Sequence, residues 1–191
     1  MQSNHKPSVK GQYLKIFLKF METQLDKTQQ EMVLEKLEPE YREKLTRKTF
    51  LATDLFPVEI VNRISRELAL IKGETLEQLS YRAGRFILED GLSGVYKAFG
   101  YVLDPMRLLS KAPIMWTTIN DTGRMEVEEL AANRVKLNLF DCPVDISQCW
   151  RSTGWATRML EIAEAKNIQI IHTKCYSRGD NCCEWKIEWE L

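Results

Sequence analysis

The sequence lacks the features on which several large classes of protein depend. Its 27 Lys and Arg residues are balanced by 27 Asp and Glu residues, and no stripe of basic residues breaks that balance. A nucleic-acid-binding domain needs surplus positive charge, so we expect no nucleic-acid partner. No apolar run approaches the length of a membrane span, and the polar first residues lack the apolar core of a signal peptide. We therefore expect a cytoplasmic protein without a membrane span.

Histidine is also scarce, and this limits the possible chemistry. The two histidines, His5 and His172, leave no Ser/His/Asp set, and no nucleotide-binding glycine fingerprint follows a predicted strand. His5 lies in a polar tail, so a haem would lack its natural axial ligand. These absences predict a protein that is not an enzyme. In a reducing compartment, the five cysteines are expected to be thiols or metal ligands rather than disulfides.

Residues 1–50 are predicted to form a helical N-terminal arm. Apolar residues at helical spacing between Val9 and Leu25 indicate an amphipathic helix, and a second helix around residues 32–37 ends before Pro39. An arm of this kind either packs on its own domain or contacts a dimer partner or a membrane surface.

Residues 51–191 are predicted to form an α+β domain. The pattern predicts helices over 58–71 and 76–87, and a third helix that starts at Asp104-Pro105 and runs toward Trp116. Strands follow around 125–127 and 135–139, and then a helix capped by Asp145 with Gln148. The chain is predicted to finish with a hairpin of residues 168–175 and 182–189. Helical spacing changes to alternation only in the second half, which is typical of helices that cover a sheet.

The C-terminal hairpin carries a candidate metal site. A Gly179-Asp180 turn doubles the chain back and brings Cys175 toward Cys183. Together with Cys149 and His172 they give three sulfurs and one imidazole, a set that structural zinc prefers. Strand alternation points Cys183 inward and Cys182 outward, and Cys142 lies in a connection before Pro143, so neither Cys182 nor Cys142 is expected to be a ligand.

One feature of this hairpin opposes the metal site. In a regular strand, His172 and Cys175 would face opposite sides of the sheet. Both can bind one ion only if the strand ends or bulges between them. The alternatives are a hydrogen-bonded, half-buried histidine at 172 and a small core residue at Cys149.

The motif Cys175-x-x-x-Gly179-Asp180-x-x-Cys183-x-Trp185, with Cys149 upstream, resembles the 4-vinyl reductase domain family. That family also supplies the sensory domain of aromatic-responsive bacterial transcription activators. The resemblance implies a zinc site at Cys149, His172, Cys175 and Cys183. His172 stands where the family has a glutamate, and both side chains are zinc ligands.

The middle of the chain is similar to a related bacterial family of unknown function, abundant in myxobacteria. The similar residues are Gly94-Val-Tyr96, Asp104-Pro105, Pro113-Ile-Met-Trp116 and Gly123. The wider superfamily also includes haem-dependent nitric-oxide sensors and vesicle-tethering TRAPP subunits. This resemblance implies helices packed on a four-stranded antiparallel sheet, with an apolar pocket between them.

The expected function is a small-molecule-binding sensory or regulatory domain with structural zinc. Aromatic and sulfur side chains that can line an apolar pocket are Phe86, Tyr96, Phe99, Tyr101, Met115, Trp116, Trp150 and Trp155. For any single one of them, ordinary core packing is the more common role of such a side chain, but as a set they permit a pocket. The alternative is an interaction or scaffold module that resembles the tethering subunits. Because the sequence holds no ATPase or DNA-binding domain, we expect a signal to pass through a homodimer or a regulatory protein partner.

Overall fold

The computed structural model describes residues 6–91, 104–143 and 145–191. Its second half is built on an antiparallel sheet with the strand order β3-β4-β6-β5. The strands are β3 (Arg124–Ala131), β4 (Arg134–Phe140), β5 (Lys166–Lys174) and β6 (Cys183–Glu190). The predicted α+β fold, with helices packed on a four-stranded antiparallel sheet, is therefore confirmed.

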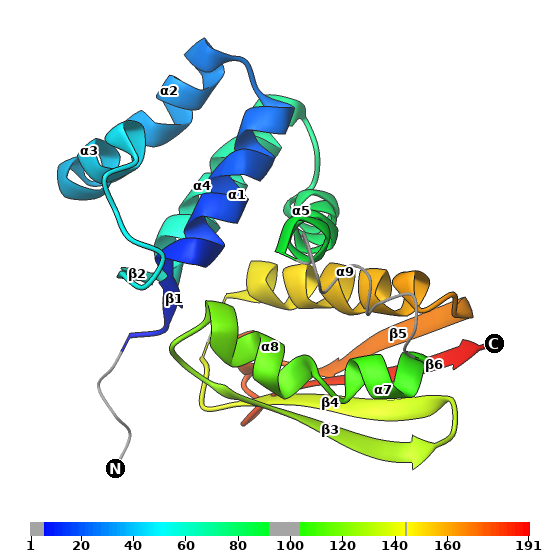
Figure 1. The fold of residues 1–191 in the computed structure, drawn as a ribbon. Coiled ribbons are helices and arrows are strands. Elements are labelled where there is room, and N and C mark those ends of the chain that lie inside the picture. The colour runs from blue at the N-terminus through cyan, green and yellow to red at the C-terminus, as the bar shows by residue number, and fades with distance from the viewer. Residues whose placement is uncertain (1–5, 92–103, 144) are drawn as a thin grey trace.

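Three helices lie over the same side of this sheet (Figure 1): α7 (Pro105–Leu109), α8 (Ala112–Ile119) and α9 (Ile146–Ile162). Alternation explains why the sheet has one apolar face. Val135, Leu137 and Leu139 of β4 are buried beneath the helices. Lys136, between them in sequence, instead pairs with Glu128 on β3.

The first half of the chain forms a helical layer beyond α9 (Figure 1). Its helices are α1 (Gly11–Gln24), α2 (Lys27–Glu35), α3 (Pro39–Arg47), α4 (Val58–Lys72) and α5 (Leu76–Gly91). Two short strands, β1 (Ser8–Lys10) and β2 (Leu55–Pro57), pair at its edge. The buried residues of α1 belong to the same hydrophobic core as those of α5 and α9, so α1 packs on its own chain.

Three local predictions are corrected by the structure. Val9 lies in β1 rather than in the first helix. The helix expected from Pro105 to Trp116 is two helices, because Pro113 has no N–H to continue the α-helical ladder. Asp145 does cap α9, but it accepts from the Ser147 backbone, and the Gln148 side chain turns to Arg151 instead of closing a capping box.

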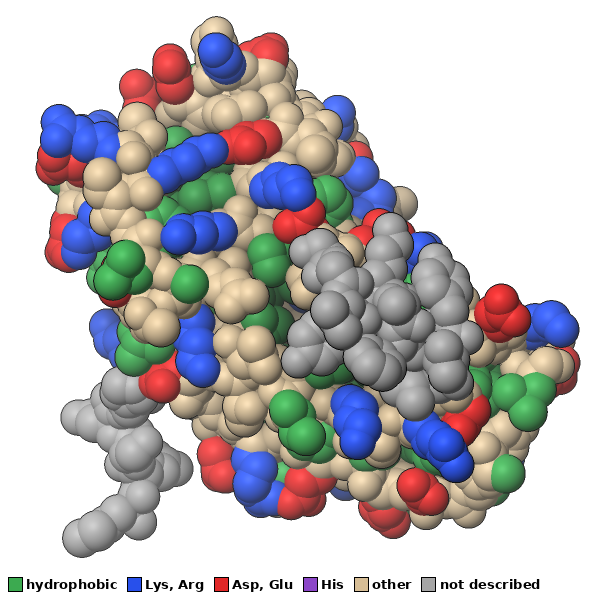
Figure 2. Space-filling view, in the orientation of Figure 1, with side chains coloured by type: hydrophobic (Ala, Val, Ile, Leu, Met, Phe, Trp, Pro, Cys, Tyr) green, Lys and Arg blue, Asp and Glu red, His purple; other side chains and the backbone are tan. Residues whose placement is uncertain are grey.

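Charges of both signs are interspersed over the face seen in Figure 2, with no continuous patch of one sign on its described residues. This distribution matches the equal numbers of basic and acidic residues. Within the described ranges, none of the helices has the length and apolar character that crossing a bilayer requires.

Candidate metal centre and apolar cavity

The structure brings together the four side chains of the expected metal site. Cys149 projects from α9, His172 lies on β5, Cys175 follows β5, and Cys183 begins β6. One ligand atom from each lies within 4.8 Å of all the others. The Cys149 sulfur is 3.5 Å from the sulfurs of Cys175 and Cys183. Two sulfurs bound tetrahedrally at about 2.3 Å from zinc are roughly 3.8 Å apart, so this spacing suits a shared ion.

The end of β5 removes the difficulty of alternation. The strand register shifts between His172 and Lys174, and the strand ends at Lys174. Cys175 is therefore free of the strand's alternation and turns to the same side as His172.

The Gly-Asp turn holds this arrangement. Gly179 adopts a φ of 90°, which glycine tolerates at no steric cost. The Asp180 carboxylate accepts a hydrogen bond of 2.8 Å from the backbone N–H of Cys175, and the Asp180 N–H donates to the Cys175 carbonyl. The turn thus fixes Cys175 opposite Cys183.

The electrostatics of the cluster favour one thiolate. The Cys149 thiol donates to the Cys183 sulfur, and this hydrogen bond lowers the pKa of Cys183 to about 5, although burial acts in the opposite direction. The same hydrogen bond, together with burial, raises the pKa of Cys149. Bound metal would replace both effects by stabilising all three thiolates.

The His172 ring is half-buried beside the three sulfurs. Neither ring nitrogen has a well-aligned hydrogen bond, and the polar group within reach is the Cys183 sulfur. The ring stacks on Trp185 at 4.9 Å, which fixes its orientation, and Trp150 meets it edge-on at 6.2 Å. A buried imidazole whose nitrogens have no well-aligned partner is costly unless a further group binds it.

The two other cysteines are buried outside this cluster. Cys182 immediately precedes β6 and is buried, whereas alternation had placed it on the polar side of the strand. It is buried because the loop, not the strand, positions it. Burial raises the pKa of Cys142 to about 12, so it remains a thiol at neutral pH.

A second site lies on the other side of α9. A cavity of about 160 Å³ is bounded by α1, α5, α8 and α9, and Ile16, Ile87, Met115 and Trp155 are among its mostly apolar lining residues. A smaller cavity of about 20 Å³ adjoins it and shares Ile87, Ile119 and Trp155 with it.

The expected pocket residues divide between these cavities and other parts of the molecule. Met115 and Trp155 line the larger cavity, while Trp116 and Trp155 line the smaller one. Phe86 packs against Phe20 instead, and Trp150 lies beside His172. The remaining candidates, Tyr96, Phe99 and Tyr101, lie outside the described residues.

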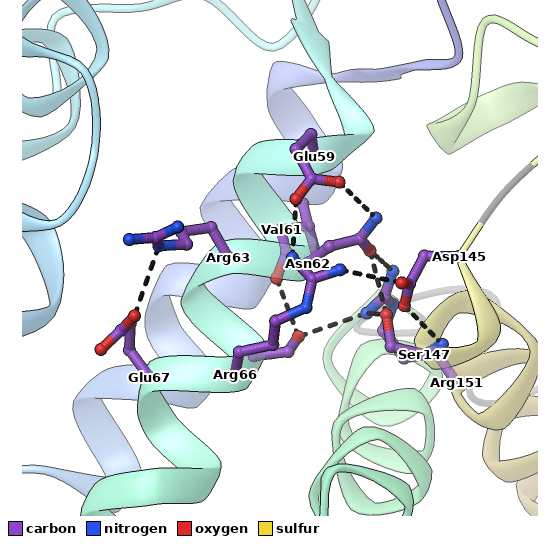
Figure 3. A network of polar contacts seen from close by, with 10 residues as sticks. Glu59, Val61, Asn62, Arg63, Arg66, Glu67, Asp145, Ser147 and Arg151 are labelled. Carbon is purple, nitrogen blue, oxygen red and sulfur yellow. Dashed lines mark hydrogen bonds and ion pairs between the residues drawn. The ribbon is translucent and has the colours of Figure 1, made fainter.

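Sequence patterns did not indicate two polar residues of the smaller cavity. Tyr13 and Arg151 line it together with Ser152. Arg151 is 1% exposed, and Figure 3 shows it directed from α9 toward Asn62 of α4. The one signal in the sequence was the position of Arg151 among apolar and small residues of α9, because an arginine exposed to solvent is usual on the polar face of a helix.

No protein-family model matches the sequence, and no curated protein is a significant match to it. Solved structures do resemble the fold. An Fe(II) unliganded H-NOX protein mutant from K. algicida superposes with a TM-score of 0.74 at 14% identity, over 95% of this chain and 97% of that one. An H-NOX protein from S. oneidensis in its Fe(II)NO ligation state gives 0.73 at 16% identity, over 95% and 99%.

A heme protein studied for protein-induced porphyrin distortion gives a TM-score of 0.64 at 11% identity, over 95% of this chain and 99% of that one. At these identities the similarity shows a shared fold and no shared site. The chain therefore has the fold of H-NOX domains.

Proposed function

We propose that the protein is a non-catalytic sensory domain that binds an apolar or aromatic small molecule in the larger cavity. The observation that carries this proposal is the cavity itself. Its volume of about 160 Å³ is close to that of a cavity of about 150 Å³ known to hold benzene. Apolar walls from four helices give the affinity, and Gln12 and Thr118 offer the few polar groups that orient a ligand.

The Cys149, His172, Cys175 and Cys183 cluster is proposed to hold one structural zinc ion. Three thiolates and one imidazole complete a tetrahedral shell, which leaves no coordination position for a substrate or a reactive water. The metal would therefore join α9 to the β5–β6 hairpin and has no catalytic task. The family resemblance of this motif to 4-vinyl reductase domains supports the same assignment.

Haem, which the fold suggests, does not fit the described residues. Haem iron needs an axial ligand inside a pocket wide enough for a porphyrin. Within residues 6–91, 104–143 and 145–191 the one histidine is His172, and its ring lies among the three sulfurs, stacked on Trp185. The larger cavity is about half the 300 Å³ at which ordinary ligand pockets begin. Its size suits a single aromatic ring.

Binding of phenol and toluene to the purified metal-loaded protein tests the proposed pocket. We expect saturable binding by calorimetry and a raised Tm, because a ligand that binds only the folded state stabilises it. Met115→Trp should abolish binding by filling the cavity. Met32→Trp makes the same change at an exposed position of α2 and should leave binding intact. No binding of either probe to the native protein contradicts the proposal.

Transmission through a homodimer or a regulatory protein is part of the proposal. A ligand shifts an assembly only through different affinities for its states. Native mass spectrometry with and without phenol measures metal, ligand and oligomeric state together. A dimer whose population is insensitive to phenol would favour the alternative interaction module.

A further inference from the structure

Arg151 is a buried charge whose partners are all neutral. Its terminal nitrogens donate to Ser65, Ser147, Asn62 and Gln148 at 2.7–3.2 Å. Within the described parts of the chain, no carboxylate forms an ion pair with it. The fifth donor, Nε–H, is buried without a well-aligned acceptor, and the guanidinium lies within reach of the Tyr13 hydroxyl. A guanidinium stays charged at all physiological pH values, so its burial without a counter-charge is costly.

The two acidic side chains of this hydrogen-bond network form ion pairs with Arg66 and not with Arg151. Glu59 and Asp145 both accept from Arg66, at 2.7 and 2.8 Å (Figure 3). They reach Arg151 only through Asn62, which donates to Glu59, and through Ser147, whose backbone N–H donates to Asp145. Neutral side chains thus separate the charge of Arg151 from every carboxylate of this network.

Two buried hydroxyls lie near Arg151. The Ser152 hydroxyl has no hydrogen bond, and the Tyr13 hydroxyl lies within reach of the Arg151 guanidinium itself; both residues line the smaller cavity beside Arg151. A guanidinium and two hydroxyls thus line one small space that has no carboxylate among its described lining residues. Groups of this kind are suited to hydrogen-bond an anion.

The smaller cavity has the size and position of a head-group pocket. Its 20 Å³ admits one or two water-sized groups, which is the size of the two oxygens of a carboxylate. Ile87, Ile119 and Trp155 line both cavities, so the polar space and the apolar space lie next to each other. A molecule that reached both would place a polar head at Arg151 and an apolar body in the larger space.

We propose that the ligand of this domain is an apolar carboxylate, such as a small aromatic acid, whose carboxylate is recognised by Arg151, Tyr13 and Ser152 in the smaller cavity. This inference rests on the proposed sensory function and adds the chemical class of the ligand. The apolar cavity supplies binding of the body, and Arg151 supplies selectivity for negative charge.

The test compares benzoate with benzamide, its neutral analogue of similar shape, and with toluene, by calorimetry on the metal-loaded full chain. We expect benzoate to bind about tenfold or more tightly than benzamide, because hydrogen bonds to a charged partner are stronger than neutral ones. Arg151→Met should abolish that preference while toluene still binds.

If Arg151→Met does not fold, two conservative variants test the same carboxylate pocket. Tyr13→Phe and Ser152→Ala each remove one hydroxyl from the cavity wall and should reduce the benzoate preference severalfold with little loss of stability. Ser80→Ala is the matched control, because Ser80 Oγ is equally buried and unpartnered but does not line the cavity. It should leave the preference unchanged.

The outcomes separate the two proposals. Equal binding of benzoate and benzamide, or a benzoate preference that survives in Tyr13→Phe and Ser152→Ala, overturns the carboxylate pocket and indicates that water alone occupies it. Toluene binding in that case leaves the apolar sensor standing. Failure of all three probes to bind overturns the sensor itself.

Discussion

At the scale of single residues, the environment of His172 favours the metal-site interpretation of the C-terminal motif. Neither ring nitrogen has a well-aligned hydrogen bond, and the polar group within reach is the sulfur of Cys183. The three neighbouring sulfurs are spaced as ligands of one ion. A metal ion bound by the imidazole and the three sulfurs would offset the cost of burying the His172 ring.

Cys175→Ser is expected to reduce zinc from about one equivalent per chain to nearly none, because a neutral hydroxyl is a poor replacement for a thiolate ligand. Elemental analysis of freshly purified protein measures the change. Cys182→Ser and Cys142→Ser are matched controls, since both cysteines are buried but lie outside the cluster. Loss of zinc in Cys182→Ser would contradict the assignment.

Residue-level prediction from sequence worked where spacing along the chain determines position. Cys175 and Cys183 flank a turn whose Gly179 and Asp180 chemistry is local, so their proximity was predictable. Arg151 was not, because its burial depends on acceptors from α4, distant in sequence. Periodicity reports which face of a helix is apolar, and it cannot report a polar pocket assembled between helices.

At the scale of elements, α5 and α9 approach each other so closely that their backbones touch. A Cβ on Gly84 would overlap the backbone carbonyl of Arg151, and a Cβ on Gly154 would overlap that of Tyr81. The two glycines thus allow the helix backbones to touch. Ion pairs from Arg85 to Glu161 and from Arg158 to Glu89 bridge the same two helices.

Gly84→Ala is expected to destabilise the protein by about 1–3 kcal/mol or more, because the added methyl forces the helices apart. The corresponding fall in Tm is several degrees for a chain of this size. Gly91→Ala, at the end of α5, is the matched control: its Cβ would meet only Ile16 at 3.7 Å. It should be neutral or slightly stabilising, because alanine favours helices. Equal losses in both variants would contradict this account.

The ion pair of Glu161 makes part of this contact sensitive to acid. The bidentate hydrogen bonds from Arg85, at 2.6 and 2.7 Å, hold the pKa of Glu161 below its ordinary value of 4.5. Because the folded pKa is the lower one, the stabilisation is complete above pH 4.5 and is lost as the pH falls through the folded pKa.

Glu161→Gln should therefore lower the free energy of unfolding by on the order of 1 kcal/mol at about pH 7, and by progressively less below pH 4.5. Urea titrations at several pH values measure the difference. Glu35→Gln, at the end of α2 and remote from the α5–α9 contact, is the control and should show no comparable loss. A Glu161→Gln effect that grows toward acid pH would contradict the assigned sign.

Element boundaries were predictable where side chains cap the backbone. Thr75 and Gln78 exchange the hydrogen bonds of the expected capping box at the start of α5. The strands β1 and β2 were not predicted, because three residues are too few to show a period. Their pairing depends on a contact that closes more than forty residues of intervening chain, which no local pattern encodes.

At the scale of the whole molecule, α9 connects the two candidate sites. Cys149 faces the sheet and the metal cluster, while Arg151 and Trp155 line the cavities. Residues 149 and 151 are roughly 200° apart around a helix, so the sites lie on opposite sides of one rigid element. Gly154 anchors the same helix against α5, whose Ile87 and Leu88 also line the larger cavity.

This connection predicts that zinc and the cavity ligand bind cooperatively. Zinc fixes the orientation of α9 on the hairpin, and toluene needs that orientation for the wall that Trp155 provides. We expect toluene to bind about fivefold or more tightly to the zinc-loaded protein than to chelator-treated protein, which is the lower end of typical coupling between sites. Calorimetry on both forms measures the difference.

Thermodynamic reciprocity gives the same prediction a second, independent measurement. If zinc strengthens toluene binding by a given factor, toluene must strengthen zinc binding by the same factor. Competition with a chromogenic chelator, with and without saturating toluene, reports that factor directly. The Met115→Trp variant, whose cavity is filled, should show no toluene effect on zinc. Equal zinc affinity with and without toluene in the native protein would mean that α9 holds two independent sites. A sensory role would then require that the binding signal be transmitted through elements other than α9.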